Sequence, residues 1–453
     1  GEKNMETKKK GFPAAFWVCA CSEIFERLAY YLGRSLILIF VTASVATGGL
    51  GLSDTVAANM QSNLTAFSYL LPLFGAVIVD KYIGARYTTP VGMFIAAAGY
   101  FTGGIAKSSV GVYAMIFLVS LGLALFKNGA IIGRVITDKS QMDPAFSMRY
   151  TLVNVGAFIG TFLVGILYKD VFAKDGVLGF APCFKMAALM MVLGGLWYIF
   201  VCWRFLGDLG KLPFKKTLTE EEKAAEAKKK EETGTKQPLT TIEKKRIGAI
   251  FVASLFSIVF WIFWYLGYMP VYFYWAENMD WVVAGYQVPS TWFDAANSLF
   301  CVILGPVTAA LWKKLAARPQ GDMSLFRKTG LGIAIIGVGY LFYAAIDIMR
   351  GGEKASVLWL IVFAFLLTMG EMFFSPLGHS FISKYSPSRY LAVMMSVWGF
   401  ATFIAAKSYG PVYGLLFGGK IEFKVACIGV AVVSFVAAII MIALDKKLSA
   451  LVD

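Results

Sequence analysis

The sequence contains little of the chemistry on which soluble enzymes and metalloproteins depend. It has one histidine, His379, which excludes a multi-histidine metal site, and its six cysteines show neither CxxC nor another zinc-binding spacing. No nucleophile, base and orienting group form a set that indicates catalysis. The glycines of TGGLGLS, from Thr47, join two apolar runs instead of following a strand, which argues against a phosphate loop. We therefore expect no enzyme, no metal site and no cofactor.

Charge is also scarce. Charged residues make up 15% of the 453 residues and hydrophobic residues 58%, and the mean hydropathy is +0.67. Soluble domains are only about half apolar, so this composition predicts a polytopic membrane protein. The net charge of +14 does not require nucleic acid, because much of the basic excess lies in segments where anionic lipid can attract it. We expect membrane lipid, and not nucleic acid, as a partner.

Apolar runs of about 20 residues, the length that a helix needs to cross about 30 Å of hydrocarbon, recur along the chain. Several are longer, which indicates tilted or projecting helices. The sequence predicts twelve spans, near residues 14–46, 56–79, 87–106, 110–137, 147–168, 181–206, 247–276, 291–316, 328–349, 355–384, 390–418 and 422–445.

The distribution of Lys and Arg predicts that both termini are cytoplasmic, in a multi-pass protein of the plasma (inner) membrane. One long polar segment, residues 207–246, contains 11 Lys and Arg and 8 Asp and Glu, which indicates a solvated linker with one charged helix. Two six-helix halves around a midplane site are typical of transporters. The predicted divisions are a cytoplasmic N-terminal tail at 1–13, an N-terminal six-helix bundle at 14–206, a charged cytoplasmic linker at 207–246, a C-terminal six-helix bundle at 247–446 and a cytoplasmic C-terminal tail at 447–453.

The first span contains the unusually polar stretch CSEIFERLAYYLGR. At 100° per residue its charges and tyrosines fall on one helix face, namely Glu23, Glu26, Arg27, Tyr30, Tyr31 and Arg34. A charge at the bilayer centre costs on the order of 2.5 to 3.5 kcal/mol, so this face must avoid lipid. It lines a wet cavity or, as the alternative, forms an internal ion-pair cluster that fixes helix packing.

Other spans carry isolated polar groups. These are Lys127, Asn154, Asn297, Glu371 and Lys407. For a lone asparagine, an interhelical hydrogen bond is an alternative nearly equal to a substrate contact. The first half supplies mostly cations and the second half supplies Glu371, an arrangement that suits a zwitterion such as a short peptide.

The stretch EIFERLAYY, from Glu23, is similar to the signature ExxERFxYY of a known family, the proton-coupled oligopeptide transporters of the major facilitator superfamily. The resemblance extends over essentially the whole chain. Further matching segments are PLFGAVIVDKYIGAR, GLALFKNG, FSMRYTLVNVGAFIG, NSLFCVILGPVTAALWKKL, FRKTGLG, GEMFFSPLGHSFISKYSPSR and the Trp of MSVWGF. The resemblance implies an all-α polytopic membrane protein with the major facilitator fold, in which 12 transmembrane helices form two six-helix bundles.

The resemblance also implies roles for single residues. The proton-coupling group would be Glu23, Glu26, Arg27 and Lys127. The substrate-binding group would be Tyr30, Arg34, Tyr69, Lys127, Asn154, Asn297, Glu371, Ser375 and Trp398. In peptide-transporting relatives the cationic wall receives the peptide carboxylate, and the glutamate that matches Glu371 receives the amine.

Departures from the family pattern are informative. Peptide-transporting relatives carry an acidic residue in span seven that pairs with the arginine matching Arg34, whereas this chain has Trp264 and Tyr265 there. Asn128 replaces a proline, and Asp294 stands where relatives commonly have Gln. Lys407 has no family role, and the linker lacks the extra pair of hydrophobic helices of many bacterial relatives.

We therefore expect a monomeric proton-coupled symporter that imports di- and tripeptides by alternating access. Proton uptake at Glu23 or Glu26 would free Arg27 or Lys127 to meet the substrate carboxylate. The alternative is a related transporter of another small anionic or zwitterionic metabolite, such as nitrate or an amino-acid derivative. A non-transporting receptor on the same scaffold is a third interpretation.

Overall fold

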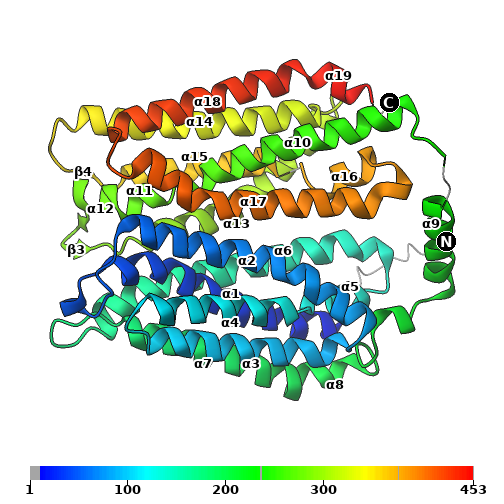
Figure 1. The fold of residues 1–453 in the computed structure, drawn as a ribbon, viewed down its shortest axis with the longest axis horizontal. Coiled ribbons are helices and arrows are strands. Elements are labelled where there is room, and N and C mark those ends of the chain that lie inside the picture. The colour runs from blue at the N-terminus through cyan, green and yellow to red at the C-terminus, as the bar shows by residue number, and fades with distance from the viewer. Residues whose placement is uncertain (1–10, 235–236, 376, 452–453) are drawn as a thin grey trace, which may run out of the picture.

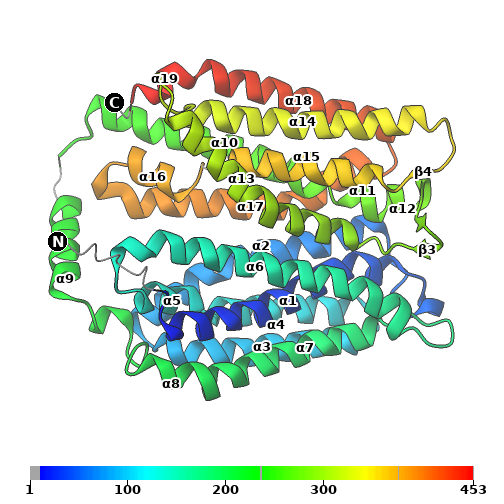
Figure 2. The ribbon, with the colours of Figure 1, turned by 180° about the vertical axis from the view of Figure 1, so that it is seen from behind.

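The computed structural model describes residues 11–234, 237–375 and 377–451, and these form two helical bundles joined by a charged linker helix (Figures 1 and 2). Most of the predicted N-terminal tail and the last two residues of the predicted C-terminal tail lie outside the described residues. The start of α1, the linker helix and the end of α18 lie at one end of the molecule, here called the linker end. The opposite end, with the short strands, is called the far end.

The N-terminal bundle surrounds the charged helix α1. Ser53 caps α2, because its side chain accepts a hydrogen bond from the Val56 amide at 3.3 Å. Two π-helical segments, at Leu167–Val171 and Tyr198–Cys202, extend α6 and join α7 to α8. The helices are α1 Ala14–Thr42, α2 Asp54–Lys81, α3 Ala85–Gly104, α4 Ser109–Leu125, α5 Asn128–Val135, α6 Met142–Ile166, α7 Phe180–Trp197 and α8 Trp203–Leu206.

The C-terminal bundle is also built of long helices, with short helices and short strands at its far end. Its helices are α10 Thr241–Leu266, α11 Met269–Tyr272, α12 Tyr274–Asn278, α13 Trp292–Ala316, α14 Leu325–Met349, α15 Trp359–Phe374, α16 His379–Tyr385, α17 Leu391–Phe417, α18 Phe423–Ala443 and α19 Asp445–Ser449. The strands are β1 Met279–Asp280, parallel to β4 Ala355–Ser356, and β2 Val282–Val283, antiparallel to β3 Tyr286–Gln287.

The linker contains the single charged helix that its composition predicts, α9 Glu220–Gly234. It lies across the linker end and reaches both bundles. On the N-terminal side the Arg134 guanidinium of α5 lies 3.7 Å from the centroid of the linker's Phe214 ring, and on the C-terminal side Arg389 donates to the Gln237 carbonyl of the linker at 2.6 Å. The linker is therefore attached at both ends.

Within the described residues, nine helical stretches are long and apolar enough to cross a membrane. The remaining three expected spans correspond to α1, α3 and α15, none of which is among the nine. Helix α1 carries four charges, and α15 ends at Phe374, which leaves it 16 residues long. Large apolar side chains such as Phe117 and Ile439 lie 62% and 67% exposed, as expected of surfaces that face lipid.

The two bundles touch along the half of the molecule nearer the far end. Helix α2 packs on α17, and α6 packs on α13. The Ser62 hydroxyl of α2 donates to the Ala406 carbonyl of α17 at 2.6 Å, and the Trp292 indole of α13 donates to the Phe162 carbonyl of α6 at 3.0 Å. Toward the linker end the bundles part, and cavities lie between them.

Candidate functional site: a charged cavity between the bundles

The carboxylates of α1 are buried inside the protein. Glu23 is 3% exposed and Glu26 is 1% exposed. Glu26 accepts two hydrogen bonds from the guanidinium of the next residue, Arg27, one of them from Nε to Oε2 at 2.5 Å. The same guanidinium lies over the Tyr30 ring, 4.5 Å from its centroid. The polar face of α1 therefore forms an ion pair and also borders a cavity, so both interpretations of its sequence hold in part.

Glu23 is paired with a residue that the sequence analysis did not single out, Arg149 of α6. The Arg149 Nη2 and Nε atoms lie 2.8 and 2.9 Å from Glu23 Oε1. Asn128, which stands where relatives have proline, donates to the same oxygen at 3.2 Å. Arg149 lies inside the family-like segment FSMRYTLVNVGAFIG, and a lone arginine in that apolar run was the signal that could have identified it.

Lys127 marks a break in the predicted fourth span. Helix α4 ends at Leu125 and α5 begins at Asn128, so the span is two helices and Lys127 caps the second. Its Nζ donates to the Pro72 carbonyl of α2 at 2.7 Å. In the described part of the chain no carboxylate lies within 4.0 Å of Lys127. Of the two cations expected to be released by a proton, only Arg27 is held by a carboxylate in this structure.

Two cavities extend from this cluster toward the linker end. A cavity of about 500 Å³ is lined by Glu23, Glu26, Arg27 and Arg149 and is here called the charged-cluster cavity. A second, of about 700 Å³, lies between α6 and α13 and is called the linker-end cavity. Both are lined by Phe146 and Tyr150, which places them next to each other. The proton-coupling candidates of α1 thus lie beside a passage that could hold water.

A small cavity of about 70 Å³, here called the central cavity, lies deeper between the bundles. Arg34 and Asn154 line it from the N-terminal bundle. Asn297 and Glu371, two of the residues predicted to contact substrate, line it from the C-terminal bundle. Among the described residues, neither Arg34 nor Glu371 has an opposite charge within 4.0 Å. The cavity therefore presents one cation from the N-terminal bundle and two carboxylates, Asp294 and Glu371, from the C-terminal bundle, none of them in an ion pair with a described residue.

The asparagines have hydrogen bonds of their own. The Asn297 amide of α13 donates to the Thr368 hydroxyl of α15 at 2.7 Å, so the interhelical bond named as its alternative is present. The Asn154 amide donates to the Tyr150 carbonyl one turn earlier at 3.0 Å. Both asparagines also line the central cavity.

The remaining predicted substrate residues are more dispersed. Ser375 lines the linker-end cavity with Asn154. Tyr30 and Trp398 are buried at 5% and 8% exposure and line none of the three cavities named here. Tyr69 is 47% exposed. In this conformation the structure gathers Arg34, Asn154, Asn297 and Glu371 and leaves the others around them.

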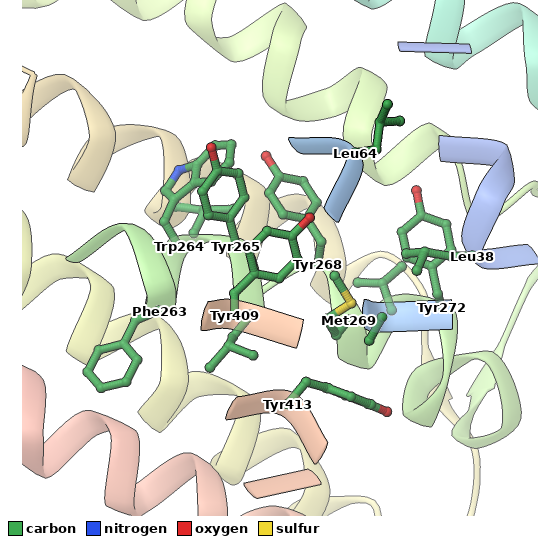
Figure 3. Close-up of a cluster of buried hydrophobic side chains, with 14 of the residues drawn as sticks. Leu38, Leu64, Phe263, Trp264, Tyr265, Tyr268, Met269, Tyr272, Tyr409 and Tyr413 are labelled. Atoms are coloured by element: carbon green, nitrogen blue, oxygen red, sulfur yellow. The ribbon is translucent and has the colours of Figure 1, made fainter. Parts of the chain in front are cut away.

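The aromatic residues of span seven occupy the face toward Arg34. Figure 3 shows Trp264, Tyr265 and Tyr268 beside Tyr409 in one cluster between the bundles. The Arg34 guanidinium lies 5.5 Å from the Tyr265 ring centroid, and the Tyr265 hydroxyl donates to the Tyr69 hydroxyl at 3.4 Å. A cation can be stabilised by a ring face without an ion pair. Tyr265 therefore meets Arg34 through its ring at the position where relatives carry an acid.

Lys407, for which the resemblance names no role, bridges the two bundles. Its Nζ on α17 donates to the Asn63 side-chain oxygen on α2. Its side chain is exposed, so it lies at the edge of the bundle contact and not in the central cavity. The contact supports a role in holding α2 against α17.

Comparison with known proteins shows which transporters the chain is similar to. A family model described as the POT family matches residues 209–417. An uncharacterized transporter of Bacillus subtilis, YclF, is 25% identical over 439 residues, which cover 88% of this chain and 87% of that protein. The peptide transporter YePEPT of Yersinia enterocolitica is 24% identical over 457 residues, which cover 88% and 86%. The chain is therefore similar to POT family transporters, over residues 209–417 by the family model and over most of its length by these relatives. Both relatives are transporters and not enzymes, and nine described helical stretches of this chain are long and apolar enough to cross a membrane, in line with the predicted multi-pass membrane transporter.

Solved POT structures have the same fold. A POT family transporter in complex with 5-aminolevulinic acid superposes with a TM-score of 0.84 at 23% identity, covering 97% of this chain and 98% of that one. A peptide transporter POT in complex with sulfate gives 0.85 at 22% identity, covering 98% and 97%. The predicted fold, a major facilitator protein of twelve spans in two bundles, is confirmed by this likeness.

Proposed function

We propose that the protein is a proton-coupled symporter that imports di- and tripeptides by alternating access. One observation carries the proposal: Arg34 of one bundle and Glu371 of the other line the same central cavity, and neither forms an ion pair with a described residue. A peptide carries a carboxylate at one end and an amine at the other, so each end meets a charge-assisted partner. Because the partners belong to different bundles, binding draws the bundles together.

Space for a peptide is available where two cavities adjoin. Asn154 and Cys301 line both the central cavity of about 70 Å³ and the linker-end cavity of about 700 Å³. We propose that the peptide carboxylate lies toward Arg34, its amine toward Glu371 and its side chains in the larger space. The similarity to YePEPT of Yersinia and to the di-/tripeptide transporter of Lactococcus lactis supports the peptide class.

Proton coupling is assigned to the Glu26 and Arg27 pair. Protonation of Glu26 would remove the charge that holds the Arg27 guanidinium, and the freed cation would then favour a negatively charged neighbour. Each proton that crosses 100 mV supplies about 2.3 kcal/mol, which drives uptake against a gradient. In this proposal protons are the coupling ion and no cofactor takes part.

The linker end is proposed to face the cytoplasm. The excess of Lys and Arg in the segments at that end supports this orientation under the positive-inside rule. Both termini would then be cytoplasmic, in a monomeric protein of the plasma membrane. The cavities open toward the linker end would make this conformation the inward-facing one.

A second candidate substrate class is a small zwitterionic metabolite. The structural relative solved with 5-aminolevulinic acid, an amino acid with separated amine and carboxylate, favours this class. Such a molecule would use Arg34 and Glu371 in the same way but would leave the linker-end cavity empty.

Counterflow in proteoliposomes separates the two candidates. Vesicles loaded with unlabelled dialanine should accumulate labelled dialanine, and external di- and tripeptides should compete, whereas tetrapeptides, nitrate and 5-aminolevulinic acid should compete weakly. Glu371→Gln should raise the KM for dialanine tenfold or more, because a charged hydrogen bond contributes about 1.5 to 3 kcal/mol.

The matched control for that variant is Glu422→Gln, a carboxylate outside the central cavity. Its KM should stay at the wild-type value. Stronger competition by 5-aminolevulinic acid than by dipeptides would establish the second candidate. Equal competition by an N-acetylated dipeptide would refute the role of Glu371, since that ligand lacks the amine.

A further inference from the structure

Asp294, near the start of α13, is the one carboxylate among the described residues of the C-terminal bundle that bonds directly to helix α1. The Ser35 hydroxyl of α1 donates to Asp294 Oδ2 at 2.9 Å. The Tyr272 hydroxyl of α11 donates to the same oxygen at 2.5 Å. This oxygen therefore fastens the N-terminal bundle to the C-terminal bundle beside the central cavity.

The other carboxylate oxygen of Asp294 has no such partner. Its Oδ1 is shielded from solvent and accepts no hydrogen bond from any described residue. A buried, half-satisfied carboxylate is costly, so its retention calls for a role that stability alone does not supply. Among the described residues, no Lys or Arg lies within 4.0 Å to neutralise it.

The charged and titratable groups around Asp294 come from both bundles. Helix α1 contributes Arg34, which lines the same cavity, and α15 contributes Glu371. The chain between α10 and α11 contributes Tyr268, and α11 contributes Tyr272. Arg34 is the only cation among them, and it lines the central cavity together with the two carboxylates Asp294 and Glu371.

The contact between Ser35 and Asp294 depends on conformation. It exists because the bundles are closed at the far end, and it must break when they part there. A hydroxyl donates more strongly to a charged carboxylate than to a neutral acid or amide, so the charge of Asp294 favours the closed state. Protonation of Asp294 favours opening, because it removes both the charge and part of the acceptor capacity.

We propose that Asp294 is a proton-sensitive positioning residue that holds the far side of the transport site closed through Ser35. This proposal rests on the alternating access of the proposed function. It assigns to α13 a closing carboxylate that span seven, with Trp264 and Tyr265, does not supply. Removal of the Asp294 carboxylate should favour opening of the far end and leave the ion pair between Glu26 and Arg27 unchanged.

Distances between spin labels test the proposal without any substrate. Val45 and Val282, which are 73% and 53% exposed at the far end of opposite bundles, would be changed to Cys in a cysteine-free background. Electron–electron resonance in nanodiscs would then report the open and closed populations. At pH 7.5, Asp294→Asn should raise the ratio of open to closed far ends about tenfold. Lowering the pH to 5.5 should raise this ratio in the wild type and change it little in the variant.

The matched control is Asp347→Asn. Asp347 is also a carboxylate near the far end of the C-terminal bundle, but its bonds to Tyr274 and to Arg350 at 2.8 Å stay within that bundle. It should leave the distances unchanged. Ser35→Ala removes the donor from the other bundle and should open the far end even if Asp294→Asn does not fold. Wild-type distances and pH response in both Asp294→Asn and Ser35→Ala would overturn the proposal, whatever the substrate is.

Discussion

At the residue scale, the chemistry of the site depends on how each buried charge is paired. Arg27 binds the carboxylate of its neighbour Glu26, whereas Glu23 is bound by Arg149 from another helix. Removing one partner from a buried pair leaves an uncompensated charge, which is why such pairs respond strongly to protonation. Two carboxylates one turn apart on α1 can therefore have different roles, one held by its own helix and one fastening α1 to α6.

Changing Glu26→Gln should separate transport from proton coupling. The amide keeps an acceptor for Arg27 but cannot take up a proton, so counterflow should persist while uphill uptake falls at least tenfold and loses its pH dependence. Uptake driven by an imposed pH gradient and by counterflow would both be measured in proteoliposomes. Glu277→Gln, an exposed carboxylate at the far end, is the control. Unchanged uphill uptake with unchanged pH dependence would show that Glu26 does not couple the proton.

The sequence predicted the charged face of α1 but not all of its partners. Glu23 and Arg149 are 126 residues apart, and only the packing of α1 on α6 brings them together. Lys127 was expected near the same carboxylates, yet its side chain reaches a backbone carbonyl, because the break before α5 aims it toward α2. Periodicity identifies a face, whereas partners on other helices depend on tertiary geometry that a single sequence does not contain.

At the element scale, most predicted spans are continuous helices, and the clearest exceptions are three. The fourth span breaks at Lys127, the seventh breaks after Leu266, and the tenth ends at Phe374, three residues after Glu371. Hydropathy does not detect such breaks, because the residues around them remain apolar. Helix interruptions at membrane depth are tolerated where the backbone lines a cavity, which fits the positions in the fourth and tenth spans.

Gly75 should be essential for the packing of α2 against α4. A Cβ atom there would lie 1.7 Å from the Ala124 carbonyl oxygen and 2.9 Å from Lys127 Cε. Gly75→Ala should therefore destabilise the protein by about 1 to 3 kcal/mol, since a backbone atom cannot move aside easily. Thermal unfolding in detergent measures the effect.

Gly305→Ala on α13 is the matched control, because a Cβ there meets nothing within 4 Å. Alanine is also the better helix former, so this variant should melt at or slightly above the wild-type temperature. Equal melting temperatures for Gly75→Ala and the wild type would contradict this prediction, because they would show that α2 can shift away from α4 without loss of stability.

At the scale of the whole molecule, the two bundles meet toward the far end and part toward the linker end. Composition and span count predict two bundles but not which side is closed, because both states of an alternating-access protein share one sequence. The closed half is held by small-residue packing and side-chain bonds between α2 and α17. Shifting that contact should shift the population of the two states.

Gly410 is a glycine of α17 that packs directly against α2. A Cβ atom there would lie 2.7 Å from Asn59 Oδ1 and 2.9 Å from its Cα. Gly410→Val should therefore part the bundles at the far end and close them around the linker-end cavity. A single Cys at Ser147, which lines that cavity, should then react with a bulky maleimide several-fold more slowly in detergent. Gly429→Val on α18, where a Cβ meets nothing within 4 Å, should not change the rate. A rate unaffected by Gly410→Val would show that far-end packing and linker-end opening are independent, which a rigid-body exchange between two states does not allow.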